Sequence, residues 1–203
     1  MPRLRNVAIL IFDDIEILDF AGPYEVFNVA SQTTTPPAFY VYNVGLWHRP
    51  VVGRGRFTVT PSYTIDDCPQ PDILIVPGGY GTRPLLKHEK LLAWIHGQST
   101  KVEWLLSVCT GALLLAKAGL LENCEATTHH TAFEQLKELS PTTSIISDRR
   151  FVQASNRIMT SGGISAGIDL SLHMVEKLVD AETRAAVVAE MEYFESGISW
   201  RRA

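Results

Sequence analysis

Short apolar runs alternate with longer amphipathic stretches along this chain. The run at residues 7–12 is rich in branched side chains, which is typical of a strand buried on both faces of a parallel sheet. By the same pattern, further strands are predicted at residues 39–45, 57–61, 72–77, 104–107, 143–147, 151–154 and 158–160.

Apolar residues at helical spacing predict helices over residues 84–97, 131–139 and 168–179, and an apolar helix that ends near Leu121. Residues 15–30 share this spacing, but Gly22 and Pro23 interrupt it, so we expect the regular helix to begin at Pro23, where proline is tolerated. A last helix, 181–195, should follow Asp180 as its N-cap. Residues 31–37, SQTTTPP, have the composition of a loop.

The alternation of strands and helices predicts an α/β fold, with a mostly parallel sheet covered on both faces as a three-layer sandwich. The 203 residues suit one domain, 1–203. Ligands of such sheets bind beyond the carboxyl ends of the strands. We therefore expect the connections at residues 13–22, 78–81 and 109–111 to meet at one edge.

The stretch WLLSVCTGALLLAKAGLL joins a predicted strand to a helix through a turn of small residues around Cys109. This pattern is typical of a nucleophile elbow, whose corner residue is strained and exposed at the sheet edge. Amides at the start of the helix favour an anion there, so a thiolate at Cys109 should form more easily than in water. The alternative is a small, inert, buried cysteine.

Asp19 is the favoured proton partner for Cys109. Four acidic residues follow the first strand, namely Asp13, Asp14, Glu16 and Asp19. Asp19 lies among apolar residues, where a carboxylate without a function would be costly to bury. If it contacts Cys109, the two groups should share one proton and supply a nucleophile and a general acid. The alternative role for Asp19 is a helix cap ahead of Pro23.

Other groups near the elbow are weaker candidates. His129 or His130 could pair with Cys109 in a hydrolase dyad, but no orienting partner occurs at a recognisable spacing, which favours a loop or structural role. The glycines at 78–81 lack a phosphate-binding spacing. The amides of Gly79 and Thr110 could instead form an oxyanion-type donor site, with a tight turn as the alternative.

Composition narrows the class of protein. The net charge is -4, and no run of Lys or Arg indicates a nucleic-acid partner. The three cysteines, Cys68, Cys109 and Cys124, match neither a disulfide framework nor a zinc site, so no metal is predicted and a reducing compartment is expected. No apolar stretch is long enough for a bilayer, and no cleavage site follows the first apolar run. We expect a cytoplasmic protein.

The motifs LDFAGP, VPGGYG, SVCTGALLLAKAGLL, ATTHH and SGGISAGIDL together resemble the DJ-1/PfpI superfamily, whose fold is flavodoxin-like and related to the class I glutamine amidotransferases. The chain is most similar to the isocyanide hydratases and to the sensor domains of AraC-type regulators. It has Asp19 where many members have Glu, as the isocyanide hydratases do. It has Thr110 where PfpI-type peptidases have His, and His130 where relatives have Trp.

This resemblance implies a lyase that hydrates an isocyanide without a cofactor. Cys109 would attack the terminal carbon, Asp19 would deliver a proton, and water would release an N-substituted formamide from the thioimidate. Thr110 would hydrogen-bond the sulfur or Asp19. The implied partners are a small-molecule substrate and a second copy of the chain, in a homodimer.

Two alternatives remain open. The first is a ligand or redox sensor of the regulator class, in which Cys109 would oxidise readily. Such regulators carry an added helix-turn-helix region, for which we expect no room before Ala203. The second is a cysteine amidase or glyoxalase-like hydrolase with His129 or His130 as its base.

Overall fold

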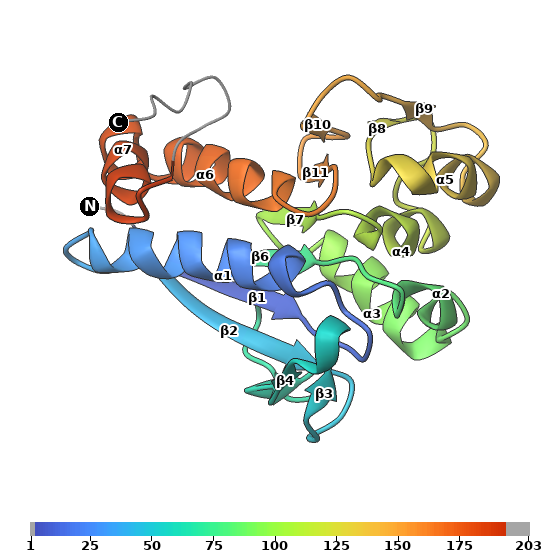
Figure 1. Ribbon diagram of the computed structural model, residues 1–203, viewed down its shortest axis with the longest axis horizontal. Coiled ribbons are helices and arrows are strands. Elements are labelled where there is room, and N and C mark those ends of the chain that lie inside the picture. Colours follow the sequence, from blue (N-terminus) through green and yellow to red (C-terminus); the bar gives the residue numbers. More distant parts are fainter. Residues whose placement is uncertain (1–2, 194–203) are drawn as a thin grey trace.

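The computed structural model describes residues 3–193 and has one central seven-stranded sheet (Figure 1). Every neighbouring pair in this sheet is parallel except β10 and β11, which confirms the predicted mostly parallel α/β fold. The strands, in their order across the sheet, are β10 (Phe151–Gln153), β11 (Ile158–Ser161), β7 (Trp104–Ser107), β6 (Ile73–Val76), β1 (Arg5–Leu10), β2 (Phe39–Gly45) and β5 (Tyr63–Thr64).

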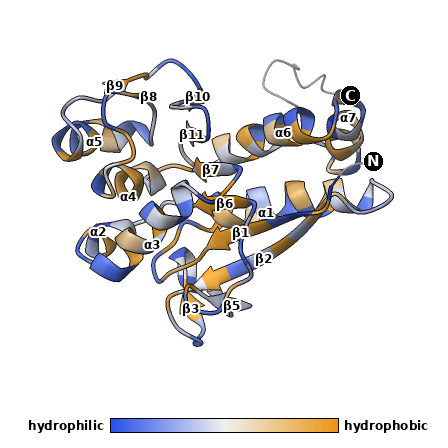
Figure 2. Cartoon of the chain, turned by 180° about the vertical axis from the view of Figure 1, so that it is seen from behind, coloured by the Kyte–Doolittle hydropathy of each residue, from blue (hydrophilic) through white to orange (hydrophobic). Residues whose placement is uncertain are grey.

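Helices form a layer on each face of the sheet. On one face, α1 (Ile17–Gln32), α6 (Ala166–Leu178) and α7 (Ala181–Glu190) contact one another. The second layer contains α2 (Thr82–Leu85), α3 (Glu89–Ser99), α4 (Gly111–Lys117) and α5 (Phe133–Leu139). Figure 2 shows hydrophobic residues concentrated on the central strands. All four residues of β6 are buried, as expected for a strand covered on both faces.

Two small strand pairs and two short 3-10 helices lie outside the main sheet. An antiparallel hairpin pairs β3 (Val51–Val52) with β4 (Thr58–Val59), and the 3-10 helix η1 (Arg54–Arg56) forms its tip. The second pair joins β8 (Glu125–Ala126) to β9 (Ser144–Ile145) in parallel, and η2 (His130–Ala132) precedes α5. No helix within residues 3–193 has the length and apolar character needed to cross a bilayer.

The first helix begins six residues earlier than the sequence predicts, at Ile17 and not at Pro23. Pro23 lies inside the helix, where it removes one backbone hydrogen bond. Packing outweighs this cost, because α1 crosses α6 so closely that a Cβ on Gly22 would lie 2.9 Å from Ile168 Cγ1. The early start places Asp19 in the first turn of α1, so the alternative of a cap ahead of Pro23 is wrong.

Several other predicted boundaries are wrong for local reasons. The strand at 57–61 is only β4, which pairs with β3, and the edge of the sheet is formed by β5. The helix at 84–97 is divided into α2 and α3, and His88 Nδ1 caps α3 by accepting from the Leu91 amide at 3.2 Å. The elbow helix ends at Lys117, just before Gly119 turns the chain with a φ of 76°.

The remaining predictions differ by fewer residues. The helix at 131–139 divides into η2 and α5, and the strand at 143–147 is β9, which pairs with β8 outside the main sheet. Helix α6 covers Ala166–Leu178 where 168–179 is expected. The Asp180 cap is confirmed, since Oδ1 accepts from the Thr183 amide at 2.7 Å. Helix α7 ends at Glu190, and the predicted end at Glu195 lies outside the described residues.

Candidate active site

Three loops that follow adjacent strands meet at the carboxyl edge of the sheet, as predicted. Strands β7, β6 and β1 are neighbours, so the loops after them are held side by side. The loops after β1 and β6 form a short bridge between Ile15 and Gly79, and the Glu16 amide donates to the Gly78 carbonyl at 3.0 Å. The loop after β6 contacts the elbow, because the Gly79 amide donates to Thr110 Oγ1 at 2.9 Å.

Cys109 occupies the corner between β7 and α4 in the strained conformation that the sequence predicts. Its φ is 55°, in the left-handed region that non-glycine residues rarely adopt. The surrounding structure holds it there: the Cys109 amide donates to the carbonyls of Ser161 and Gly162, both at 3.1 Å. The residue is 5% exposed and lines a cavity, so the sulfur is buried from bulk solvent and still borders a ligand-sized space.

Asp19 lies beside Cys109 and is completely buried. Its Oδ2 accepts from the Gly78 amide at 3.0 Å. Its Oδ1 has no partner of regular hydrogen-bond geometry among the described residues. The Cys109 thiol is the side chain that interacts with this carboxyl most strongly. Burial raises the pKa of Asp19 to about 7, while hydrogen bonding with the Cys109 thiol and the Gly78 amide lowers it. Two ionisable groups in contact titrate as a pair, which we call the Cys109–Asp19 pair.

The expectation of an easily formed thiolate is wrong in its net effect. Burial and the neighbouring charge of Asp19 raise the pKa of the Cys109 thiol well above its usual range. The Thr110 amide lowers this pKa, as expected for a donor at the start of a helix, but the two opposing effects are larger. At neutral pH the pair therefore holds at most one negative charge, and the second ionisation is strongly opposed.

Thr110 joins the elbow to the loop after β6. Its Oγ1 accepts from the Gly79 amide at 2.9 Å and also lies 3.2 Å from the Gly79 carbonyl. Its backbone amide is the group that faces the sulfur. The hydroxyl therefore contacts the Gly79 loop and occupies the Gly79 amide. The role of the Gly79 amide as an oxyanion donor stays a prediction.

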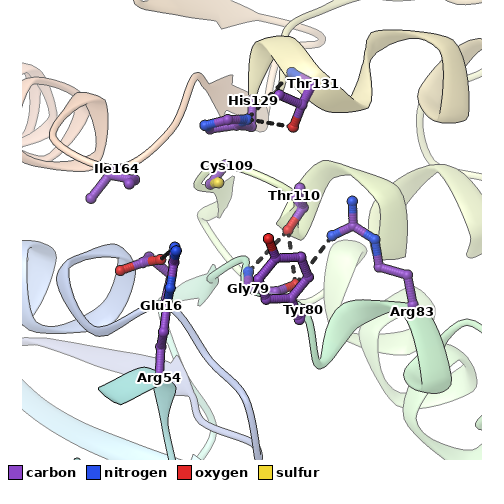
Figure 3. Close-up of a pocket in the computed structure, with 10 residues that line it drawn as sticks. All are labelled: Glu16, Arg54, Gly79, Tyr80, Arg83, Cys109, Thr110, His129, Thr131 and Ile164. Carbon is purple, nitrogen blue, oxygen red and sulfur yellow. Dashed lines mark hydrogen bonds and ion pairs between the residues drawn. The ribbon is translucent and has the colours of Figure 1, made fainter.

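The cavity above Cys109 has a volume of about 80 Å³ and opens to the surface (Figure 3). Several of its residues were missed by the sequence analysis because they come from segments far apart in the chain. Glu16 and Arg54 form an ion pair of 2.7 Å, and the Arg54 guanidinium lies over the Tyr80 ring at 5.6 Å. The lining consists of Glu16, Arg54, Gly79, Tyr80, Arg83, Cys109, Thr110, His129, Thr131 and Ile164.

The two histidines, which stack with ring centroids 4.3 Å apart, differ in position. His129 lines the cavity, whereas His130 is outside the lining. The His129 Nδ1 accepts from the Thr131 amide at 3.3 Å, so in the neutral ring the proton is on Nε2. Burial and nearby positive charge lower the pKa of His129, which keeps the ring neutral near pH 7. His129 therefore both caps η2 and offers the cavity a hydrogen-bond donor.

Known proteins share both the sequence pattern and the fold of this chain. An isonitrile hydratase from Pseudomonas putida is 35% identical over 197 residues, which cover 95% of this chain and 82% of that protein. The HTH-type transcriptional regulator GbdR from Pseudomonas aeruginosa is 28% identical over 96% of this chain, which spans about half (53%) of the regulator's length.

Solved structures agree with these sequence relatives. A ThiJ/PfpI family protein from Pseudomonas syringae has a TM-score of 0.84 and 26% identity, covering 97% of this chain and 80% of that one. Drosophila melanogaster DJ-1beta shares the fold, with a TM-score of 0.80 and 18% identity over 94% of this chain and 98% of that one. The model of the DJ-1/PfpI family matches residues 5–177, and the chain therefore belongs to the DJ-1/PfpI family.

Proposed function

We propose that this protein hydrates an isocyanide to an N-substituted formamide, with Cys109 as nucleophile and Asp19 as the proton-transfer group. The observation that carries the proposal is the contact between a buried carboxyl and a buried thiol at the base of a small cavity. The 35% identity to an isonitrile hydratase supports the choice of substrate.

The first step adds the thiol across the terminal carbon of the isocyanide. Asp19 takes the Cys109 proton as the sulfur attacks, and then gives that proton to the same carbon, which yields a thioimidate. A carboxyl whose pKa is about 7 suits both halves of this transfer at neutral pH. No free thiolate has to accumulate, which accommodates the raised pKa of Cys109.

The second step consumes one water molecule. Water adds to the thioimidate carbon, and the adduct carries one hydroxyl on carbon and one hydrogen on nitrogen. Cleavage of the carbon–sulfur bond returns the proton to the Cys109–Asp19 pair and releases the formamide. The Thr110 amide, which faces the sulfur, would stabilise negative charge as the sulfur leaves.

A direct test is incubation with a simple alkyl isocyanide, with formamide followed by NMR. The wild-type protein should form the product, and Cys109→Ala should form none. Asp19→Asn should lose about 10²- to 10⁴-fold in kcat, the usual range for a general acid–base group. Cys68→Ala is a matched control, since Cys68 is a half-buried thiol outside the cavity. Product formation that survives Cys109→Ala would refute the proposal.

A second candidate is a ligand sensor, which the similarity to GbdR favours. A sensor would bind a small molecule in the same cavity and leave it unchanged. Single-turnover incubation with the isocyanide separates the two, because the hydratase proposal requires formamide formation and a sensor would leave the isocyanide unchanged.

The hydrolase alternative has weaker support. A Cys–His dyad needs an unprotonated ring nitrogen directed at the sulfur, but His129 Nδ1 is used by the Thr131 amide and Nε2 carries the proton. We further propose that the protein works as a cytoplasmic homodimer. The dimer rests on the family resemblance, and sedimentation at low micromolar concentration tests it.

A further inference from the structure

Arg83 is a cation of the cavity without an acidic partner. Its Nη1 donates to the Gly79 carbonyl and to Thr82 Oγ1, both at 3.2 Å, and both acceptors are neutral. Within residues 3–193, no carboxylate forms an ion pair with it. Arg54, the other arginine of the lining, is neutralised by Glu16. Among the described residues of the lining, Arg83 is therefore the arginine without a carboxylate partner.

The largest influences on the reacting pair come from groups other than Arg83. The groups that shift the pKa of Cys109 most are Asp19, Glu16 and the Thr110 amide, together with burial, and Arg83 is not among them. The main influences on Asp19 are burial, Cys109, Gly78 and Glu16. Arg83 is instead among the charges that lower the pKa of His129, which lines the same cavity.

The position of Arg83 suits recognition of a substrate group. In Figure 3 the Arg83 guanidinium and the Ile164 side chain lie on opposite sides of the Cys109 sulfur. A guanidinium has five N–H donors in a planar fork that matches a carboxylate. Hydrogen bonds to Gly79 and Thr82 hold this fork through Nη1, and the arginine is half-buried, which limits its screening by water.

We propose that the cavity selects isocyanides that carry a carboxylate, and that Arg83 is the specificity-determining residue that binds it. The inference rests on the proposed hydration and names its substrate class. A small compound of this class is isocyanoacetate, and addition of water to it gives N-formylglycine. The small volume of the cavity favours a carboxylate attached close to the isocyano group.

The test compares isocyanoacetate with its neutral methyl ester in wild type, Arg83→Gln and Lys87→Gln. The measured quantity is the ratio of kcat/KM for the acid to that for the ester. Wild type should prefer the acid, and Arg83→Gln should reduce the ratio about tenfold, as expected for loss of one charge-assisted bond in a partly exposed site. Lys87→Gln removes one positive charge from an exposed residue outside the cavity and should keep the ratio.

The outcomes separate this inference from the proposed function. Turnover of both compounds with a ratio that Arg83→Gln leaves unchanged overturns the role of Arg83 and keeps the hydratase. If neither compound is converted, the hydratase proposal fails. Binding of N-formylglycine and of its methyl ester, measured by calorimetry, then tests whether the cavity has a carboxylate-binding site at Arg83. Tighter binding of the acid, lost in Arg83→Gln, supports the site, and equal binding of acid and ester overturns it.

Discussion

The hydroxyl of Thr128 donates to the backbone carbonyl of Cys109 at 2.7 Å, and both residues are buried. This bond fixes the elbow from the side of the loop after β8. Removing the hydroxyl leaves a buried carbonyl without its partner, which costs about 1–3 kcal/mol. We predict that Thr128→Val lowers the free energy of unfolding by this amount. It should also lower kcat for the proposed hydration, because the strained backbone at Cys109 relaxes.

Urea denaturation and steady-state kinetics check this prediction. Thr100→Val is a suitable control, since Thr100 is exposed and its hydroxyl bonds only to the local Gly97 carbonyl. Its effect on stability should stay within about 0.5 kcal/mol. Equal effects of the two substitutions would contradict a special role for Thr128.

Burial of Asp19 should make the folded protein less stable as pH rises. Its pKa is about 7 in the folded state and near 3.8 in a model peptide, so the folded state binds the proton more tightly. The contribution of Asp19 to the free energy of unfolding is therefore greatest below about pH 4, falls as pH rises from about 4 to 7, and levels off above that. Asp19→Asn removes this dependence and keeps an oxygen acceptor for the Gly78 amide.

We predict that the free energy of unfolding of Asp19→Asn rises relative to that of the wild type between about pH 4 and 7. The rise should reach up to about 1.4 kcal/mol per pH unit. Unfolding free energies measured at several pH values between 4.5 and 7.5 test this. The unfolding free energies of the two proteins should converge at the acid end of this range. Parallel curves throughout would show that Asp19 has an ordinary pKa.

Alkylation of Cys109 should report the coupling within the Cys109–Asp19 pair. Once the pair has lost its first proton near pH 7, loss of the second is opposed by the remaining negative charge. The rate at which iodoacetamide alkylates Cys109 in the wild type should therefore level off above about pH 7. In Asp19→Asn the thiol titrates alone, so its rate should keep rising about tenfold per pH unit.

Mass spectrometry of the three cysteines measures these rates in one sample. Cys68 and Cys124 serve as internal controls, and their pH profiles should be the same in both proteins. If the Cys109 profiles of wild type and Asp19→Asn coincide, the thiol and the carboxyl are not coupled and the proposed proton transfer fails.

Two neighbouring glycines provide a matched test of the space above the sulfur. A Cβ on Gly163 would lie 2.2 Å from His129 Cδ2 and 3.0 Å from Cys109 Sγ, so the ring and the sulfur cannot both keep their positions. A Cβ on Gly162 would meet nothing closer than 3.7 Å, which is ordinary contact. We predict that Gly163→Ala lowers kcat/KM more than tenfold, because a misplaced reacting group is costly.

Gly162→Ala should change kcat/KM by less than about twofold, since surface-like substitutions are usually nearly neutral. Circular dichroism and the melting temperature show whether both variants fold. Equal activity of the two variants would contradict close packing over Cys109.

The sequence was sufficient for the central strands of the sheet, the elbow and the pairing of Cys109 with Asp19, because each depends on a local pattern: an apolar run, a turn of small residues, and one acid among apolar neighbours. It was not sufficient for the edge strand β5, nor for the placement of β4 and β9 outside the main sheet. It was not sufficient for the start of α1, since the contact between Gly22 and Ile168 joins distant segments. For the same reason it missed Arg54 and Arg83, whose position in the cavity depends on a hairpin and a short helix.

The sign of the shift in the Cys109 pKa was also beyond the sequence. The amides at the start of α4 follow from the chain itself, but the depth of burial and the nearness of the Asp19 charge come only from the packed fold. Local donors and long-range desolvation act in opposite directions here, and only the structure shows which is larger.

Asp19 and Cys109 lie beyond the carboxyl ends of β1 and β7, two strands that flank β6, whereas Arg54 in the hairpin tip and Ile164 after β11 come from other segments. Part of the cavity wall therefore comes from segments that do not hold the Cys109–Asp19 pair. If the proposed hydration is correct, substitutions in these segments would change the size and polarity of the cavity and leave the Cys109–Asp19 pair in place.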